Sequence, residues 1–299
     1  MPDPFNGPVH TATSRQGALL ALASMFSVQL GAALAAQLIG ELGSSGVAWL
    51  RLAWASVLML VMVRPRTAAF TRSALLNCVA LGVATAGFTL LFTAAIGRIP
   101  LGTASALEFL GALSIAVTKG SGPTRVLLPG AAAVGVVLLT EPWVGAVDPV
   151  GVLCALGSAV CVAVYILLTQ RVSDEVSGIA GLAVSIPVAG LIATVIAGPS
   201  TVGHLTPRLL LIGLGLAILL PVVPFVLEMA ALRRLSAASF GTLMSLEPAF
   251  AMVLGLLILH QLPAATAIVG LALVVAAGVG AARTGSRSAA APEPVPALY

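Results

Sequence analysis

Two glutamates lie inside long apolar runs, and their position suggests binding chemistry. Glu108 lies in "IPLGTASALEFLGALSIAV" and Glu247 in "FGTLMSLEPAF", each near the middle of its run. A charged side chain at the centre of a membrane-spanning helix costs about 2.5–3.5 kcal/mol on insertion scales. Such a carboxylate faces a bundle interior or a water-filled cavity, where it can bind a proton or a cationic group. The alternative is a protonated glutamate that hydrogen-bonds a neighbouring helix and serves packing alone.

Other polar side chains in the apolar runs could join such a site. Arg51 lies near one end of its run, so it either reaches the lipid headgroups or turns inward to hold a carboxylate with two parallel hydrogen bonds. Glu228 lies about one turn from two consecutive arginines, and an ion pair there competes with a binding role. Tyr165 and Gln29 are weaker candidates, because polar side chains more often link helices than hold a ligand.

Three prolines are expected to break helices close to these charges. Pro248 follows Glu247 directly, removes one backbone donor and frees the carbonyl of Met244. Pro221 and Pro224 interrupt another apolar run near its middle. Backbone groups freed inside a membrane must point at protein, water or ligand. The prolines therefore predict flexible or discontinuous helices.

The residue types argue against several other kinds of chemistry. His10, His204 and His260 are far apart, and the sequence has neither an H-E-x-x-H motif nor a P-loop. The three cysteines lie in apolar runs without paired spacing, so we interpret them as small buried side chains. We expect no metal site, no cofactor, no enzymatic activity and no nucleic-acid partner.

The composition is typical of a protein that crosses a membrane several times. Of its 299 residues, 59% are hydrophobic and 8% are charged, against about 25% charged in soluble domains. A soluble fold of this size could not hide so much apolar surface. A spanning helix needs about 20 mostly apolar residues. We predict an all-α membrane protein with ten spans at roughly 17–39, 45–63, 73–97, 100–118, 124–140, 148–170, 176–197, 208–231, 236–259 and 263–282.

The basic residues give these spans an orientation. Cytoplasmic loops carry an excess of lysine and arginine. With the N-terminus inside, the cytoplasmic side holds Arg15, Arg64, Arg66, Arg72, Lys119, Arg125, Arg171, Arg233, Arg234, Arg283 and Arg287. The opposite side holds only Arg98 and Arg208 among the loop residues considered. The excess of basic residues on one side appears only if all ten predicted spans cross the membrane. It predicts that both termini are cytoplasmic.

The two halves of the chain carry similar segments. Residues 94–117 read "AAIGRIPLGTASALEFLGALSIAV", and residues 230–255 read "AALRRLSAASFGTLMSLEPAFAMVLG". We therefore divide the chain into a cytoplasmic tail (1–16), two five-helix repeats (17–140 and 141–282) and a disordered cytoplasmic tail (283–299). Because each repeat has an odd number of helices, the second repeat enters the membrane from the opposite side and is inverted relative to the first. Many secondary transporters have this arrangement. Chance similarity between two alanine-rich helices is the alternative.

Four stretches carry a resemblance to a known family. They are "SGVAWLRLAWASVLML", "IPLGTASALEFLGALSIAV", "GVLCALGSAVCVAVYILLTQR" and "LPVVPFVLEMAALRRLSAASFGTLMSLEPAFAMVLGLL". The chain resembles the ten-helix exporters of the drug/metabolite transporter superfamily, and within it the inner-membrane threonine and homoserine exporter branch. The resemblance implies inverted repeats, a central cavity and alternating access. Two departures are Ala112, where such exporters often have proline, and His260–Gln261, where relatives commonly have Gly-Glu.

These observations predict a secondary transporter in a bacterial inner membrane. We expect it to export small amino acids or related zwitterionic metabolites, in exchange for protons. The alternative within transport is efflux of amphipathic cationic drugs, which needs a carboxylate but no arginine. The expected partners are a small-molecule substrate and membrane lipid, and the sequence leaves a homodimer open.

Overall fold

A computed structural model describes residues 8–63, 70–118, 124–141, 148–175, 180–232, 234–235 and 237–284. Within these ranges the regular elements are all helices, which confirms the all-α prediction. Several residues used in the orientation argument lie outside the described ranges: Arg64, Arg66, Lys119, Arg233 and Arg287. So do residues 1–7 of the predicted N-terminal tail and residues 285–299 of the predicted C-terminal tail.

The first helix, α1 (Pro8–Val63), contains the first two predicted spans. Its helical geometry is interrupted at Gly43, whose φ of 69° and ψ of 163° are outside the helical region. Glycine adopts a positive φ without the steric cost that a Cβ atom brings. The chain therefore kinks between the two predicted spans without forming a separate loop.

The remaining helices follow the other predicted runs closely. They are α2 (Arg72–Ile96), α3 (Leu101–Thr118), α4 (Thr124–Thr140), α5 (Pro149–Glu175), α6 (Ala180–Thr201), η2 (Val202–His204), α7 (Pro207–Ala217), η3 (Ile218–Val222), α8 (Val223–Leu232), α9 (Ala237–Met244), α10 (Glu247–Leu259) and α11 (Ala265–Thr284). Thr71 and Thr206 cap α2 and α7, because each hydroxyl accepts a hydrogen bond from a backbone N–H in the first turn.

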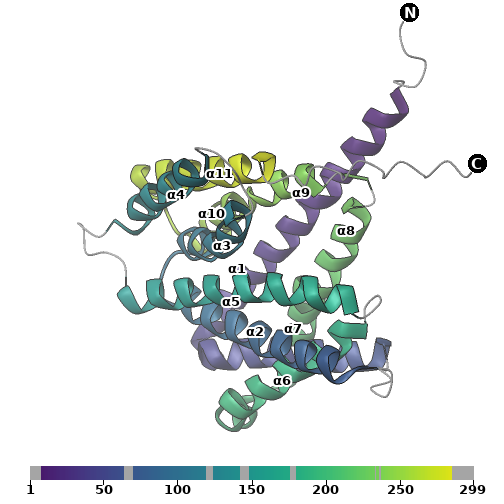
Figure 1. Ribbon diagram of the computed structural model, residues 1–299. Coiled ribbons are helices and arrows are strands. Elements are labelled where there is room, and N and C mark those ends of the chain that lie inside the picture. The colour runs from purple at the N-terminus through teal and green to yellow at the C-terminus, as the bar shows by residue number, and fades with distance from the viewer. Residues whose placement is uncertain are drawn as a thin grey trace, which may run out of the picture.

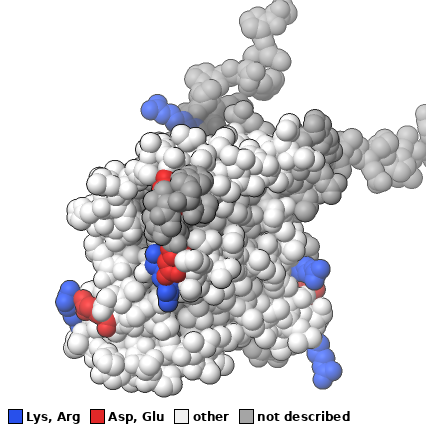
Figure 2. Space-filling view, turned by 90° about the vertical axis from the view of Figure 1, so that its left-hand side faces the viewer, with Lys and Arg blue, Asp and Glu red and all other residues white. Residues whose placement is uncertain are grey.

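The helices have the lengths and compositions of a membrane protein. In the described ranges, five stretches are long and apolar enough to cross a membrane: Arg15–Val63, Arg72–Ile96, Pro149–Val172, Ala180–His204 and Ser239–Leu259. Shorter apolar helices cover Leu101–Ile115, Val126–Thr140, Pro207–Leu220 and Ala265–Ala281. Most of the surface visible in Figure 2 is uncharged, with charged side chains gathered in a few places. The count of ten spans stays a prediction.

Two predicted spans are broken, and both breaks lie at prolines. The run 208–231 forms α7 and α8, joined by the π-helical segment η3, which contains Pro221. The run 236–259 ends its first helix at Met244 and restarts at Glu247, just before Pro248. By contrast, α3 is continuous across Ala112, as the absence of proline there predicts.

The helices pack closely through small residues. Figure 1 shows α2 beside α5 and α4 beside α11, while α1 crosses the molecule and contacts α6, α8 and α10. A Cβ atom on Gly82 of α2 would lie 2.6 Å from the carbonyl oxygen of Ser185 in α6. Membrane helices approach this closely where glycine or alanine lies at the contact. Such contacts fix the helices that carry the candidate site.

Candidate functional site

Hydrogen bonds across α1, α3, α5 and α10 bring the two glutamates into one region. Ser158 of α5 donates from Oγ to Glu108 Oε1 over 2.6 Å. Gln29 of α1 donates from Nε2 to Glu247 Oε1 over 3.0 Å and to Ser105 Oγ over 3.4 Å. Ser105 precedes Glu108 by about one turn of α3, and the two carboxyl groups are close enough to interact electrostatically. The structure therefore places Glu108, Glu247 and Gln29 together.

The amide of Gln29 has an unused acceptor. Its side chain is 1% exposed, and its Oε1 atom is buried without a hydrogen-bond donor among the described residues. The donor end of the amide faces Glu247, since an oxygen would repel a carboxylate. Buried acceptors are normally satisfied by protein or water. This atom is thus an available acceptor beside the carboxylate.

The Glu-Pro pair begins a helix in the middle of a predicted span. Glu247 is the first residue of α10, and the chain turns tightly before it, with the Leu246 N–H donating to the Leu243 carbonyl over 2.9 Å. Helix N-termini carry a partial positive charge that favours a nearby carboxylate. Pro248 costs no hydrogen bond at this position, because the first N–H groups of a helix have no partner within it. The break therefore gives Glu247 a favourable electrostatic environment inside the bundle.

Arg51 turns inward. Its Nη2 donates to Thr89 Oγ1 of α2 over 3.0 Å, and its charge interacts with Glu108. A guanidinium has five N–H donors, so Arg51 can bind Thr89 and a ligand carboxylate together. The sequence left open whether Arg51 reaches the lipid headgroups or turns inward, and in the structure it turns inward.

Glu228 also faces a neighbouring helix. Ser24 of α1 donates from Oγ to Glu228 Oε1 over 2.9 Å. Arg234, one of its two expected ion-pair partners, instead donates to the carbonyl of Ala230 over 2.7 Å. The other expected partner, Arg233, lies outside the described residues. The competing ion pair is therefore absent for Arg234.

Tyr165 of α5 contacts an aromatic residue of α2 and interacts with an acidic residue of α8. Its ring packs edge-on against Phe88 of α2, with ring centroids 5.6 Å apart and planes inclined at 72°. It also interacts electrostatically with Glu228, which in turn interacts with Glu247. The acidic and aromatic candidates are thus neighbours in one polar region.

The proline break in the eighth predicted span is supported from α1. Ser27 donates from Oγ to the Leu219 carbonyl over 2.8 Å, and Ser24 Oγ lies 3.4 Å from the Pro224 carbonyl. Pro221 lies in the π-helical segment between these two carbonyls. Two carbonyls at the break therefore have partners on α1, in keeping with the need to pair backbone groups inside a membrane.

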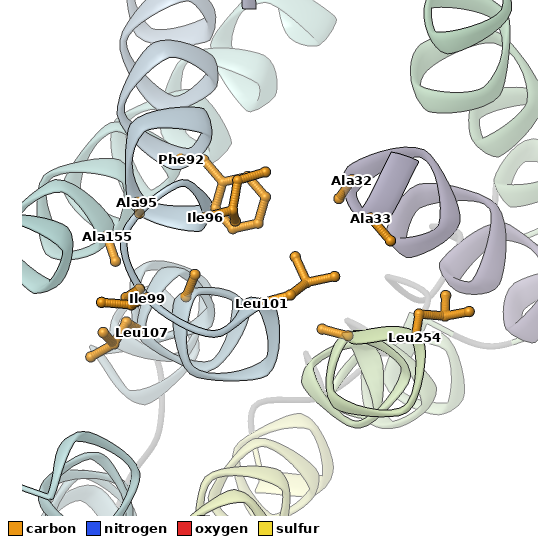
Figure 3. Packing of buried hydrophobic residues seen from close by; sticks show 12 residues of the cluster. Ala32, Ala33, Phe92, Ala95, Ile96, Ile99, Leu101, Leu107, Ala155 and Leu254 are labelled. Carbon is orange, nitrogen blue, oxygen red and sulfur yellow. The ribbon is translucent and has the colours of Figure 1, made fainter. Parts of the chain in front are cut away.

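A buried apolar cluster lies beside this polar region, around the α2–α3 turn, and is shown in Figure 3. Its members come from α1, α2, the α2–α3 turn, α3, α5 and α10: Ala32, Ala33, Phe92, Ala95, Ile96, Ile99, Leu101, Ala104, Leu107, Ala155, Ala251 and Leu254. At the same turn, Arg98 forms an ion pair of 2.9 Å with Asp148. The Leu101 N–H donates to Gln261 Oε1 over 2.9 Å, which holds the loop after α10 against α3.

In other parts of the molecule, the described residues form separate clusters. Ala21, Met25 and Ala231 join α1 to α8, and Cys78, Leu81 and Val172 join α2 to α5. These two clusters share no member.

Sequence reasoning missed the serine partners of the site residues. Ser24 donates to Glu228 and Ser158 donates to Glu108. Ser105 accepts from the amide of Gln29. Ser24, Ser105 and Ser158 lie in apolar runs, where a small hydroxyl usually marks a helix contact. Their residue type gave no signal that separates the two roles. In the part of the chain that the structure describes, no group of three or more His, Cys, Asp or Glu residues could hold a metal ion.

Comparison with known proteins decides the family. Residues 149–281 match the EamA-like transporter family. The chain is 35% identical over 269 residues to the threonine/homoserine exporter RhtA of Salmonella typhimurium strain LT2, covering 89% of this chain and 91% of the relative. The chain belongs to the EamA-like transporter family. Within the drug/metabolite transporter superfamily, it is a membrane transporter and not an enzyme, which confirms both predictions.

Two further comparisons concern a second relative and the fold. The threonine/homoserine exporter RhtA of Escherichia coli strain K12 is 36% identical over 270 residues, with 89% of this chain and 91% of the relative covered. A solved structure described as "Crystal structure of protein" superposes with a TM-score of 0.53 at 15% identity, over 91% of this chain and 96% of that one. The latter likeness concerns the fold alone.

Proposed function

We propose that this family member exports small zwitterionic amino acids, of the threonine or homoserine kind, across the bacterial inner membrane. The observation that carries the proposal is one buried cation and two carboxylates held in a single polar region. Arg51 can take the substrate carboxylate bidentately, and Glu247 can take its ammonium group. Gln29 offers a second acceptor beside Glu247. The relatives that bear the name threonine/homoserine exporter support the same substrate class.

The transporter is built from ten spans in two inverted repeats. The packing supports this, because replacing each span by the span five positions away in the chain reproduces the main helix–helix contacts. The helices α2, α3, α4 and α5 are the third to sixth spans, and α1 begins with the first span. The helix α8 belongs to the eighth span, α9 and α10 form the ninth, and α11 is the tenth. The pair α2–α5 exchanges with α8–α1, and α3–α5 exchanges with α10–α1. The pair α3–α4 exchanges with α9–α11, while α4–α11 exchanges with itself. Chance similarity between two helices does not account for a shared packing pattern.

The hydrogen bonds of the candidate site follow the same exchange. Glu108 accepts from Ser158 in the sixth span, and Glu247 accepts from Gln29 in the first. Ser158 Oγ also lies 3.2 Å from a carbonyl oxygen of the third span, and Ser27 donates to a carbonyl of the eighth span over 2.8 Å. The two glutamates thus occupy corresponding places, each beside the first helix of the other repeat.

Transport proceeds by alternating access. In this proposal, the end that carries Arg98 faces outward, as the predicted orientation assigns it, and is closed in the state described here. The buried apolar cluster between α3 and α10 at that end supports this assignment. Opening requires α3 and α10 to separate around Leu101 and Leu254. The breaks before Glu247 and at Pro221 give the helices places to flex. Alternating access then delivers substrate from the cytoplasm to the outside.

Export is coupled to proton entry through the glutamates. Two carboxylates in a low-dielectric region resist ionising together, so a proton taken up from outside stabilises the region after the substrate leaves. Glu228, which interacts with Glu247, provides a further step toward the opposite end. An ammonium group and a proton then compete for the same carboxylate, which links export to proton import.

Counterflow in proteoliposomes tests the substrate class. Vesicles are loaded with unlabelled threonine, homoserine, their amides or cationic dyes, and uptake of labelled threonine is measured. We expect accumulation with the two amino acids as internal substrates, and little with amides or dyes. Protein-free vesicles serve as the control for leakage. Accumulation driven by dyes but not by amino acids would instead establish the drug-efflux alternative.

An imposed pH gradient tests the coupling separately. Vesicles preloaded with threonine are diluted into acidic or neutral medium, and the efflux rate is measured. Coupled export predicts faster efflux into the acidic medium, and the difference should vanish with a protonophore. Efflux that ignores the gradient would leave a facilitator without proton coupling.

A further inference from the structure

A groove of about 610 Å³ lies between α1 and α7, away from the glutamates. Its walls are mainly apolar and include Leu34 and Leu38 of α1 and Ile212 and Leu216 of α7. Leu34 is 36% exposed, so the groove is open along its side. Its lining therefore suits an apolar chain that enters from the surrounding membrane.

Two opposite charges lie at one end of this groove. Glu41 precedes the kink of α1, and Arg208 is the second residue of α7. Both side chains are exposed, and in the described part of the chain they form no ion pair with each other. Arginine binds phosphate with two parallel hydrogen bonds, and a carboxylate accepts hydrogen bonds from a primary ammonium group. The pair therefore complements a ligand that carries both groups.

The groove has the depth of one membrane leaflet. The lining continues along the broken helix from Arg208 to Leu219, a rise of about 16 Å at 1.5 Å per residue. A bilayer has a hydrocarbon core of about 30 Å. Charges at one end and an apolar wall about half a bilayer long match the order of groups in one phospholipid.

We propose that this groove binds one zwitterionic aminophospholipid of the phosphatidylethanolamine class from the outer leaflet. Arg208 holds the phosphate, Glu41 holds the ammonium, and an acyl chain lies along Leu38, Ile212 and Leu216. The apolar end of the groove reaches Ile218 and Leu219, the first two residues of the π-helical segment. The lipid therefore contacts a helix break that the transport cycle uses.

Native mass spectrometry of the purified transporter tests this site. The delipidated protein is mixed with equal amounts of phosphatidylethanolamine, phosphatidylcholine and phosphatidylglycerol, and the retained adducts are counted. We expect about tenfold preference for phosphatidylethanolamine, the size of one charge-assisted hydrogen bond. Phosphatidylcholine lacks the N–H donors for Glu41, and phosphatidylglycerol lacks the positive charge.

Two variants and two matched controls locate the adduct. Gly215 lines the groove, and a Cβ added there meets nothing within 4 Å, so Gly215→Phe is chosen to place a ring in the groove. Gly130 in α4 has the same free space, and Gly130→Phe is its control. Arg208→Gln should also remove the preference, whereas Arg171→Gln, at an exposed arginine of α5, should keep it. Melting temperatures measured in detergent verify that each variant is folded.

The outcomes separate this site from other occupants. Equal retention of the three lipids, or a preference that survives Gly215→Phe and Arg208→Gln, would overturn the proposal and leave annular lipid only. A dimer mass that is lost in the Gly215→Phe variant would mean that a second copy of the chain occupies the groove. That result would also overturn the lipid proposal. Because the readout is lipid binding, the result is independent of whether the transporter carries amino acids.

Discussion

At the scale of single residues, the sign of each buried charge decides what can bind. Glu247 lies at the start of α10 and accepts a hydrogen bond from Gln29. Replacement by glutamine keeps its shape and its hydrogen-bonding capacity but removes the negative charge. We predict that Glu247→Gln loses most transport while the melting temperature of the protein stays near that of the wild type.

Counterflow and thermal unfolding in detergent measure these two effects. Glu175→Gln is the matched control, because Glu175 is exposed at the end of α5 and accepts hydrogen bonds from Ser73 and Asn77 rather than from site residues. Wild-type counterflow in the Glu247→Gln variant would mean that this glutamate serves packing alone.

Arg51 separates the two transport hypotheses. If its planar guanidinium holds the substrate carboxylate, Arg51→Lys should raise KM for threonine by about tenfold, because an ammonium cannot present two parallel donors. Amino-acid amides should be poor substrates of the wild type. Arg171→Lys is the control for a general effect of the substitution. Equal transport of acids and amides by the wild type would favour cationic drug efflux.

At the scale of elements, the site depends on how closely α3 approaches α5. A Cβ on Gly111 would collide with the backbone of Ala159, next to Ser158. We predict that Gly111→Ala lowers the stability of the fold by about 1–3 kcal/mol and weakens transport by separating Glu108 from Ser158. Gly130→Ala, where the new atom meets nothing, should leave both unchanged. Thermal unfolding and counterflow of the two variants provide the check, and equal behaviour would contradict the proposed close contact.

The stability contributed by the Arg98–Asp148 ion pair depends on pH. The hydrogen bond from Arg98 and the backbone N–H of Val150 hold the pKa of Asp148 below its ordinary value, which is about 3.9. A lowered folded pKa means that the pair stabilises the protein above the unfolded value and is lost only as pH falls through the folded one. Asp148→Asn should therefore leave the shape of the transport profile unchanged between about pH 6 and 8.

In contrast to Asp148, the glutamates of the candidate site should determine the pH profile of transport. Under the proton-coupled mechanism, Glu108→Gln should flatten the profile over the same pH interval, in the same proteoliposome assay. A profile that Asp148→Asn reshapes and Glu108→Gln leaves unchanged would assign the pH dependence to the loops rather than to the interior.

At the scale of the whole molecule, the proposed alternating access requires α3 and α10 to separate at the end that carries Arg98. Leu101 Cβ lies 3.5 Å from the place of a Cβ on Gly255, a separation that suits a disulfide. In a background without native cysteines, we predict that Leu101→Cys with Gly255→Cys stops counterflow under oxidation. Reduction should restore it, and each single cysteine should be insensitive. Unchanged counterflow in the fully crosslinked protein would contradict the opening of α3 from α10.

The sequence by itself determined the solvent of this protein and most of its helices. Scarce charge and long apolar runs leave a membrane as the only environment that covers such a surface. The unusual cost of charge in those runs also identified Glu108, Glu247, Arg51 and Glu228 as candidates before any contact was known. Local backbone chemistry likewise predicted the breaks, because proline acts on its own turn.

Only the tertiary structure decided what each candidate touches. Arg51 could have reached the headgroups, and Glu228 could have paired with Arg234, since a long side chain near a helix end can turn either way. Contacts with Thr89 and Ser24 settled both directions. The hydroxyl partners stayed hidden for a related reason: a serine that serves a carboxylate and one that fills a helix contact have the same local sequence. Their difference lies in the helix across the interface, which sequence spacing does not encode.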